Sequence, residues 1–279
     1  MVIFPRPTNL GRIESYQLHQ YELTYTYVAL TLSLSNLKIF LSLSENIMQF
    51  TQPLVHGKLI KRYKRFLADI ELKNGTILTV HCPNTGTMLS CSDPGSPVCL
   101  SKSDNPKRKY PFTLEMVHAN NTWIGVNTAK TNKLVVEAIT EGQIDEFMGF
   151  TALKTEVKVS DHSRLDLRIT KEKEITYVEI KNCSLAIEGC AQFPDAVTKR
   201  GTKHLHELEK LVQKGFGACI FFLVQRMDTD RFTPAAHIDP EYSKALQHAA
   251  KNEVQILVYQ ADVKPEGIHV VRSLPYSLG

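Results

Sequence analysis

Three charged residues in the second half of the chain have the types and the spacing of a divalent-metal site. Asp166 lies in one strand-like segment, and Glu179 and Lys181 lie in the next. If residues 171–174 form the loop between two antiparallel strands, residue 170 faces 175 and Asp166 lies opposite Glu179. Opposed residues have Cβ atoms roughly 4.5–5.5 Å apart, which is close enough to share one hard cation. Lys181 follows Glu179 by two residues and therefore projects from the same face of its strand.

These side chains suit the hydrolysis of a phosphodiester. Carboxylate oxygens bind Mg²⁺ or Mn²⁺, and such an ion stabilises charge on the phosphate and lowers the pKa of a bound water. Lys181 can orient that water or offset the phosphate charge. Glu137, on an expected helix upstream, is a candidate third acid. The pattern alone also fits a cross-strand salt bridge on a solvated hairpin. Val178 and Ile180 alternate with Glu179 and Lys181, so one strand face is apolar and the other charged, which favours the metal site.

The elements that must position these residues follow an α/β pattern after about residue 128. Asn132 could cap a helix that Gly142 weakens or ends. Three strand-like runs come next, near residues 153–159, 164–170 and 175–182. They are followed by a helix with its apolar face at 205–212, which runs to Gly215, and by an unbroken apolar strand at 218–224. A helix at 240–251 and a last strand at 254–259 complete the pattern. The order α-β-β-β-α-β-α-β predicts a layered α/β domain with a mixed sheet.

The segment before this domain has a different texture. Residues 54–122 contain short strand-like runs separated by turn signals, among them Asn74-Gly75, a strong hairpin signal between two such runs. Several short strands at this spacing suggest a small barrel, for which an OB-type barrel is one compact option. We therefore expect an OB-like domain over residues 48–127 and an α/β domain over residues 128–279.

Residues 1–47 differ from the rest of the chain. They contain no Asp and no Cys, and the Leu- and Ser-rich stretch at 28–43 is interrupted by Asn36 and Lys38. A membrane span needs roughly 20 mostly apolar residues, so this stretch is a poor one. We interpret the segment as a non-native or poorly structured leader before a natural start at Met48, with an N-terminal membrane anchor as the alternative.

The bulk composition is that of a globular protein. The chain has 43% hydrophobic and 22% charged residues and a formal net charge of +4, which permits nucleic-acid binding without requiring it. None of the six cysteines forms a Cys-x-x-Cys pair, and no secretory signal precedes them. These features predict a reduced, cytoplasmic protein without a membrane partner.

Basic residues gather in three segments. The first has five cations in eight residues with Tyr63 and Phe66 interleaved, and the second ends in Tyr110. Cations contact phosphates and aromatic rings stack on bases, so we expect both clusters to bind nucleic acid, although each alone also fits a solvated strand face. The third begins the helix after Lys181, where free N–H groups could also hold a phosphate. The candidate contacts are Lys58, Lys61, Arg62, Lys64, Arg65, Lys107, Arg108, Lys109, Lys199, Arg200, Lys203 and His204.

Two other patterns carry less chemistry. His204 and His206 diverge by about 200° on a helix, so they cannot both face one ligand, and His204 is the better functional candidate. Asn84-Thr85-Gly86 is interpreted as a tight barrel turn and not as a phosphate loop, because no Gly-Lys-Ser/Thr follows it.

From Met48 to the C-terminus the chain resembles the sugar fermentation stimulation protein (SfsA) family of prokaryotes. Six stretches carry the resemblance: Arg65–Asp69, His81–Gly86, Ser103–Pro111, Ser163–Asp166, Val178–Asn182 and Phe193–Gly201. The resemblance implies an N-terminal OB-like domain and a C-terminal PD-(D/E)XK nuclease-like α/β domain. It also implies DNA binding linked to sugar metabolism, with Asp166 and Glu179 as metal ligands and Lys181 as the catalytic lysine.

Three functions fit these residues. The first is a DNA-binding protein with a Mg²⁺- or Mn²⁺-dependent phosphodiesterase site. The second is a non-enzymatic DNA-binding regulator of sugar metabolism genes, and the third is an RNA-binding or RNA-processing protein. No helix presents a clear base-reading face, so we expect non-specific or shape-based binding.

Overall fold

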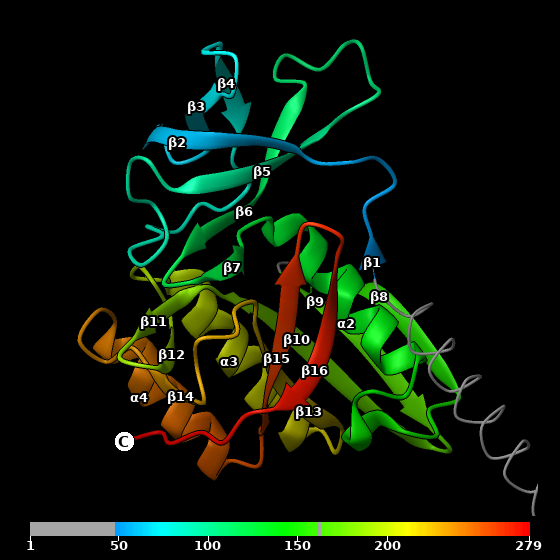
Figure 1. The fold of residues 1–279 in the computed structure, drawn as a ribbon. Coiled ribbons are helices and arrows are strands. Elements are labelled where there is room, and N and C mark those ends of the chain that lie inside the picture. The colour runs from blue at the N-terminus through cyan, green and yellow to red at the C-terminus, as the bar shows by residue number, and fades with distance from the viewer. Residues whose placement is uncertain (1–47, 161–162) are drawn as a thin grey trace, which may run out of the picture. The chain divides into compact units, whose positions relative to one another are not determined.

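The computed structural model describes residues 48–160 and 163–279, which form one compact unit (Figure 1). The expectations for the leader, including the natural start and the membrane anchor, concern residues 1–47 and lie outside the described residues. Among the described helices, none is long and apolar enough to cross a membrane.

The N-terminal part is a small barrel, as expected. Its strands are β2 (Val55–Tyr63), β3 (Leu67–Leu72), β4 (Ile77–His81), β5 (Pro97–Lys102), β6 (Phe112–Ala119) and β7 (Thr122–Gly125), in the order β4-β3-β2-β5-β6-β7. A parallel pairing of β4 with β6 closes five of these strands into a ring. Its interior is filled by side chains such as Ile70, Val80 and Leu114, each fully buried. Gly75, with φ of +80°, makes the predicted turn between β3 and β4.

The C-terminal part is built on a seven-stranded mixed sheet, also as expected. Its order is β1-β16-β15-β13-β10-β9-β8, and the β10–β13 and β13–β15 pairs are parallel. These strands are β1 (Met48–Gln49), β8 (Ala152–Ser160), β9 (Ser163–Lys171), β10 (Glu174–Cys183), β13 (Gly217–Val224), β15 (Gln255–Lys264) and β16 (Gly267–Ser273). Because β1 pairs with β16, Met48 and Gln49 belong to this sheet and not to the barrel in which the sequence-based boundary placed them.

A second, three-stranded sheet was not expected from the sequence. It contains β11 (Leu185–Ile187), β12 (Cys190–Phe193) and β14 (Arg231–Pro234), in the order β11-β12-β14. These strands have three or four residues each, too few to show an alternating pattern.

Helices cover both faces of the large sheet (Figure 1). The helical segments are η1 (Thr128–Lys130), α2 (Thr131–Thr140), η2 (Asp145–Phe147), α3 (Lys199–Gln213) and α4 (Pro240–Lys251). Phe221 on β13 packs in the cluster that contains α2, and its neighbour Phe222 packs in the cluster that contains α3 and α4. The apolar strand predicted at 218–224 is therefore buried on both faces, as its unbroken pattern indicated.

The helix starts follow local hydrogen bonding. The Thr198 side chain accepts from Gly201 N at the start of α3, and the Asp239 side chain accepts from Tyr242 N at the start of α4. Asn132 does not cap α2, as the sequence suggested, because α2 begins one residue earlier and Asn127 caps the preceding η1 turn.

The β9–β10 hairpin has the predicted register. Thr170 pairs with Ile175, and the ladder continues to Leu167 paired with Val178. Lys171 and Glu174 also pair, so the loop is shorter than the predicted 171–174. The next position along the two strands places Asp166 beside Glu179.

Candidate functional site

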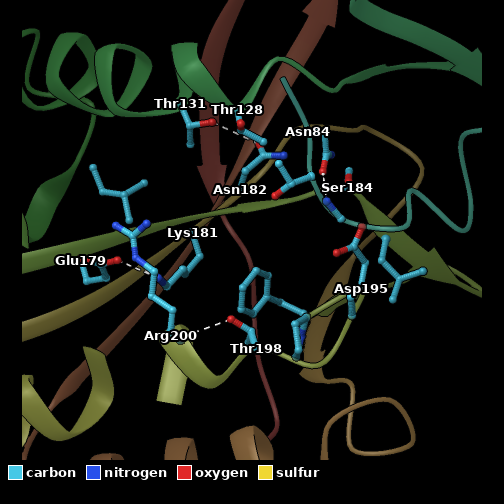
Figure 2. Close-up of a pocket in the computed structure, with 18 of the residues that line it drawn as sticks. Asn84, Thr128, Thr131, Glu179, Lys181, Asn182, Ser184, Asp195, Thr198 and Arg200 are labelled. Atoms are coloured by element: carbon cyan, nitrogen blue, oxygen red, sulfur yellow. Dashed lines mark hydrogen bonds and ion pairs between the residues drawn. The ribbon is translucent and has the colours of Figure 1, made fainter. Parts of the chain in front are cut away.

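A cavity of about 460 Å³ opens between the barrel and the large sheet and contains two of the three predicted acids, Asp166 and Glu179. Figure 2 shows Glu179 and Lys181 in this cavity. The sheet contributes Asp166, Glu179 and Lys181, and the barrel contributes Arg65 and the loop at 84–86. The other lining residues come from η1, from the starts of α2 and α3, from β10 and from the segment between β10 and α3: Thr128, Thr131, Asn132, Ile180, Asn182, Ser184, Leu185, Gln192, Phe193, Pro194, Asp195, Ala196, Val197, Thr198, Arg200 and Gly201.

Asp166 is held by one donor on each carboxylate oxygen. Asn132 Nδ2 donates to Oδ1 at 2.7 Å, and the Ile180 backbone N–H donates to Oδ2 at 2.7 Å. Burial and the neighbouring Glu179 charge raise the pKa of Asp166 to about 6, although these two donors and Lys181 act in the opposite direction. Two carboxylates in a partly dry site therefore repel each other.

Glu179 is 3% exposed, and its two oxygens have different surroundings. Oε1 accepts from Lys181 Nζ at 2.6 Å and contacts His204 Nδ1. Oε2 is buried and has no hydrogen-bond partner among the described residues. Burial alone would raise the pKa of Glu179, but the His204 hydrogen bond and the Lys181 charge outweigh it and hold the pKa below its ordinary value.

His204 is placed differently from the sequence expectation. It is 5% exposed on α3, so it is buried behind Glu179 and does not face a phosphate. Arg200 Nε can only donate, and it donates to His204 Nε2 at 3.4 Å. His204 therefore carries its proton on Nδ1 and donates it to Glu179 Oε1. Lys181 Nζ, 3.4 Å from the same Nδ1, is a neighbour of that N–H and not its donor.

Glu137, the predicted third acid, does not line this cavity among the described residues. Its carboxylate lies 3.9 Å from Lys133 on the same helix. The face of α2 that meets the sheet carries Leu134, Val135 and Ala138, and Asn132 is the residue of α2 that reaches Asp166. Helix periodicity could not show this rotation, because both Asn132 and Glu137 are polar.

The residues of the first basic segment have different surroundings in the barrel. Arg65 lines the cavity, whereas Arg62 donates to the backbone oxygens of Arg65, Asn84, Gly86 and Thr87 at 2.8–3.1 Å. Arg62 therefore shapes the 84–87 loop, and it does not line the cavity as Arg65 does. Lys61 lies 3.8 Å from Asp69 and over the Tyr63 ring, Lys64 is exposed in the turn after β2, and Lys58 lines a separate cavity.

The other two basic segments are mostly at the surface. Lys107 and Lys109 are exposed, and Arg108 lies 3.3 Å from His81 Nδ1. Burial and the Arg108 charge lower the pKa of His81. Of the α3 residues, Arg200 lines the cavity, while Lys199 and Lys203 are exposed outside its lining.

The 84–87 loop forms part of the cavity wall, which the sequence did not reveal. Asp195 Oδ2 accepts from Met88 N at 2.9 Å, and Thr87 Oγ1 donates to the Asp195 backbone oxygen at 2.5 Å. A Cβ on Gly86 would lie 2.2 Å from the Asp195 carboxylate, so only glycine permits this approach. Asp195 belongs to a stretch that carries the family resemblance, which was the available signal for it.

The donor set fits a hard divalent cation with few protein ligands. Glu179 Oε2 and Gln192 Oε1, both on residues of the cavity wall, are buried oxygens without partners among the described residues. Within residues 48–160 and 163–279, no group of three or more His, Cys, Asp or Glu side chains is arranged to hold a metal ion. Asp166 and Glu179 alone suffice for Mg²⁺, which is usually bound by one or two carboxylates and keeps several waters.

Comparisons with known proteins agree with this architecture. Residues 129–267 match the "Sugar fermentation stimulation protein RE domain" model, and residues 60–126 match the "SfsA N-terminal OB domain" model. A sugar fermentation stimulation protein homolog of Desulfotalea psychrophila is 57% identical over 231 residues, which cover 83% of this chain and 95% of that protein. A homolog from Geotalea uraniireducens is 48% identical over 227 residues, covering 81% and 98%.

A solved relative has the same fold. The structure of Pyrococcus furiosus SfsA in complex with Ca²⁺ superposes with a TM-score of 0.77 at 24% identity, over 83% of this chain and 98% of that one. With an OB domain, a restriction-endonuclease-type domain and relatives matched over nearly their whole length, the chain belongs to the sugar fermentation stimulation protein family.

Proposed function

We propose that this protein is a nucleic-acid-binding phosphodiesterase that depends on Mg²⁺ or Mn²⁺ and acts on DNA in the cavity between the barrel and the sheet. One observation carries the proposal: Glu179 has a buried oxygen that no described residue pairs with, beside the carboxylate of Asp166 and the ammonium of Lys181. Burying an unpaired acceptor costs stability, and a cation bound at this oxygen would offset that cost.

Each residue of the site has a distinct part in the proposed reaction. Asp166 and Glu179 would hold the cation, which would polarise the phosphate and lower the pKa of a water molecule. Asn132 and the Ile180 N–H fix the orientation of Asp166. Lys181 leaves Glu179 to offset charge on the phosphate or to orient the attacking water. Arg65 and Arg200 line the same cavity and contact flanking phosphates.

The archaeal relative supports the choice of cation class. That protein was solved in complex with Ca²⁺, a hard cation that prefers oxygen ligands, as do Mg²⁺ and Mn²⁺. The carboxylates Asp166 and Glu179 provide the same ligand chemistry in this chain.

The test is cleavage of single- and double-stranded DNA and RNA with Mg²⁺, Mn²⁺ or EDTA. We expect metal-dependent cleavage of DNA that Asp166→Ala and Lys181→Ala abolish and that Lys171→Ala preserves. Lys171 is a matched control because it is exposed at the end of β9, outside the cavity. Cleavage that survives in both active-site variants contradicts the proposal, and selective cleavage of RNA replaces DNA with RNA as the substrate.

A DNA-binding regulator without cleavage is the second candidate. One observation favours it: the described residues bring two acids together, not the three that were expected. Binding that weakens as salt rises, with no cleavage of any substrate by the metal-loaded protein, supports this candidate.

A further inference from the structure

A second and larger cavity, of about 840 Å³, lies on the barrel and has no role in the proposed reaction. It opens between the first part of β2, the β3–β4 turn, the start of β5 and β7, and it shares no lining residue with the first cavity. Its volume lies within the roughly 300–1,000 Å³ that is usual for ligand sites. The usual ligand surface of an OB barrel follows its second and third strands, here β3 and β4, and the loops after the first and fourth strands. This cavity includes Glu71 and Leu72 at the end of β3 but lies at the β3–β4 turn, away from those loops.

One wall of this cavity is Trp123, the only tryptophan of the chain. Trp123 is partly buried and has the His118 ring packed edge-on against it, with centroids 5.0 Å apart. Leu72 and Pro97 add apolar surface to the lining. Such a site suits a planar aromatic group, because flat rings stack on an indole and lose water from both faces.

The rim of the cavity is mainly cationic. Lys58 and Lys73 line it together with His56, against a single acid, Glu71. A smaller cavity adjoins it and shares His56, Leu72 and Lys73. An aromatic wall with two ammonium groups matches a base that carries a phosphate. It does not match an uncharged apolar ligand, which would gain nothing from the lysines.

The two cavities lie toward opposite ends of the β2–β3 hairpin. Lys58 is on β2, and Arg65, in the turn at the far end, lines the first cavity. The five strand steps from Lys58 to the end of β2 at Tyr63 span about 17 Å, and Arg65 follows in the turn. A stacked single strand rises about 3.4 Å per nucleotide, so at least about five nucleotides are needed to reach from one cavity to the other.

We infer that the second cavity binds an unpaired nucleotide of a single-stranded stretch of nucleic acid, with the base stacked on Trp123 and its phosphate held by Lys58 and Lys73. The inference rests on the proposed function for the nature of the ligand. It specifies single-stranded nucleic acid as the ligand, because the bases of an intact duplex are stacked on each other and cannot enter the cavity. It also predicts a minimum length for tight binding.

Trp123 provides the test, since its fluorescence reports this cavity alone. In EDTA, which prevents cleavage, single-stranded oligonucleotides of about twelve nucleotides should change the emission to saturation, whereas oligonucleotides of about four should bind far more weakly. Lys73→Ala should weaken binding about tenfold, and Trp123→Ala, followed by the anisotropy of a labelled oligonucleotide, should do the same. Lys251→Ala, an exposed lysine at the end of α4, is the matched control and should bind like the unaltered protein.

The outcomes separate this inference from the proposed function. Oligonucleotides that bind by anisotropy without any change in Trp123 emission, or equally well to Trp123→Ala, overturn the inference and leave cleavage possible. An emission change that Lys73→Ala weakens supports the inference, even if no substrate is ever cut. If free mononucleotides bind as tightly as the long oligonucleotide, the inference that the cavity binds a nucleotide of a single-stranded stretch is overturned.

Discussion

At the scale of single residues, the site depends on the difference between the two oxygens of Glu179. Lys181 and His204 both engage Oε1, and the buried Oε2 has no described partner. Arg200 sets this arrangement indirectly, because its bond to Nε2 leaves the His204 proton on Nδ1. A metal ligand whose orientation is fixed by such neighbours binds its ion at a lower entropic cost.

Two substitutions at His204 should show whether metal affinity depends on the hydrogen-bond donor at Nδ1 or on the volume of the imidazole ring. Asparagine places an amide N–H₂ where Nδ1 lies, so His204→Asn should keep Ca²⁺ affinity, measured by calorimetry. His204→Leu removes the donor and should weaken that affinity by about tenfold to a hundredfold. In ¹⁵N NMR spectra we expect the Nδ1–H tautomer in the unaltered protein and a loss of that preference in Arg200→Ala. Equal Ca²⁺ affinity in the Asn and Leu variants contradicts this role for His204.

Asp166 should make metal binding dependent on pH. Its pKa of about 6 lies above the ordinary 3.8, so protonation stabilises the metal-free fold at acid pH, and this contribution is lost as the pH rises through about 6. A cation needs the ionised form and reverses that loss. Affinity for Ca²⁺ should therefore rise between about pH 5 and about pH 7.5, with proton release detectable by calorimetry in buffers of different ionisation enthalpy. Asp166→Ala is the control, and an affinity that is flat over this range contradicts the prediction.

At the scale of elements, the sequence predicts those structures that are determined by residues close to one another along the chain. The β9–β10 register follows from a short turn and from the alternation of Val178 and Ile180 with charged residues, and the structure confirms it from Thr170–Ile175 onward. The barrel and the mixed sheet follow from strand spacing and from the apolar run at 218–224 in the same way. A hairpin is a local structure, so local patterns determine it.

Contacts between distant segments could not be predicted in this way. Asp195 meets Met88 across 107 positions, and nothing near either residue indicates the other. The rotation of α2 decides between Glu137 and Asn132, and composition cannot distinguish two polar residues on one helix. Arg62 looked like a phosphate contact because charge is visible in a sequence, whereas the four carbonyls that bind it are not.

Arg62 and Arg65 form a matched pair for the turn after β2. Arg62→Ala removes donors from the 84–87 loop, leaves the part-buried carbonyls of Asn84 and Gly86 without that partner and should lower the free energy of unfolding by about 1 kcal/mol. Arg65→Ala should leave stability unchanged, weaken nucleic-acid binding and reduce the slope of log affinity against log salt by about one. Urea denaturation and salt titrations measure the two effects. The opposite assignment, with stability lost only in Arg65→Ala, contradicts the structure of this turn.

At the scale of the whole molecule, buried polar contacts join the barrel to the large sheet. Arg226 is fully buried and donates to Ser184 O at 2.6 Å and to Ser90 Oγ at 2.8 Å, on the two sides of the junction. Gly125 N donates to Gln225 O at 2.9 Å. Such bonds need defined geometry, so they hold the barrel in one orientation more strictly than apolar packing would. The cavity wall is therefore made by the junction itself.

Asp195 belongs to this junction and lines the cavity, and its removal should affect the substrate and not the metal. Asp195→Ala removes the acceptor of the Met88 N–H, so the barrel side of the cavity loses its side-chain bond to the segment before α3 and keeps the Arg62 bonds within the barrel. We expect cleavage measured as kcat/KM to fall by about tenfold to a hundredfold, because a misplaced substrate reacts slowly even at an intact site. Ca²⁺ affinity should be unchanged, since Asp166 and Glu179 keep their own donors. Asp195→Asn, which retains a side-chain oxygen for Met88 N, should recover most of the activity. A parallel loss of metal affinity in Asp195→Ala would show instead that the junction supports the carboxylates and not the path of the substrate.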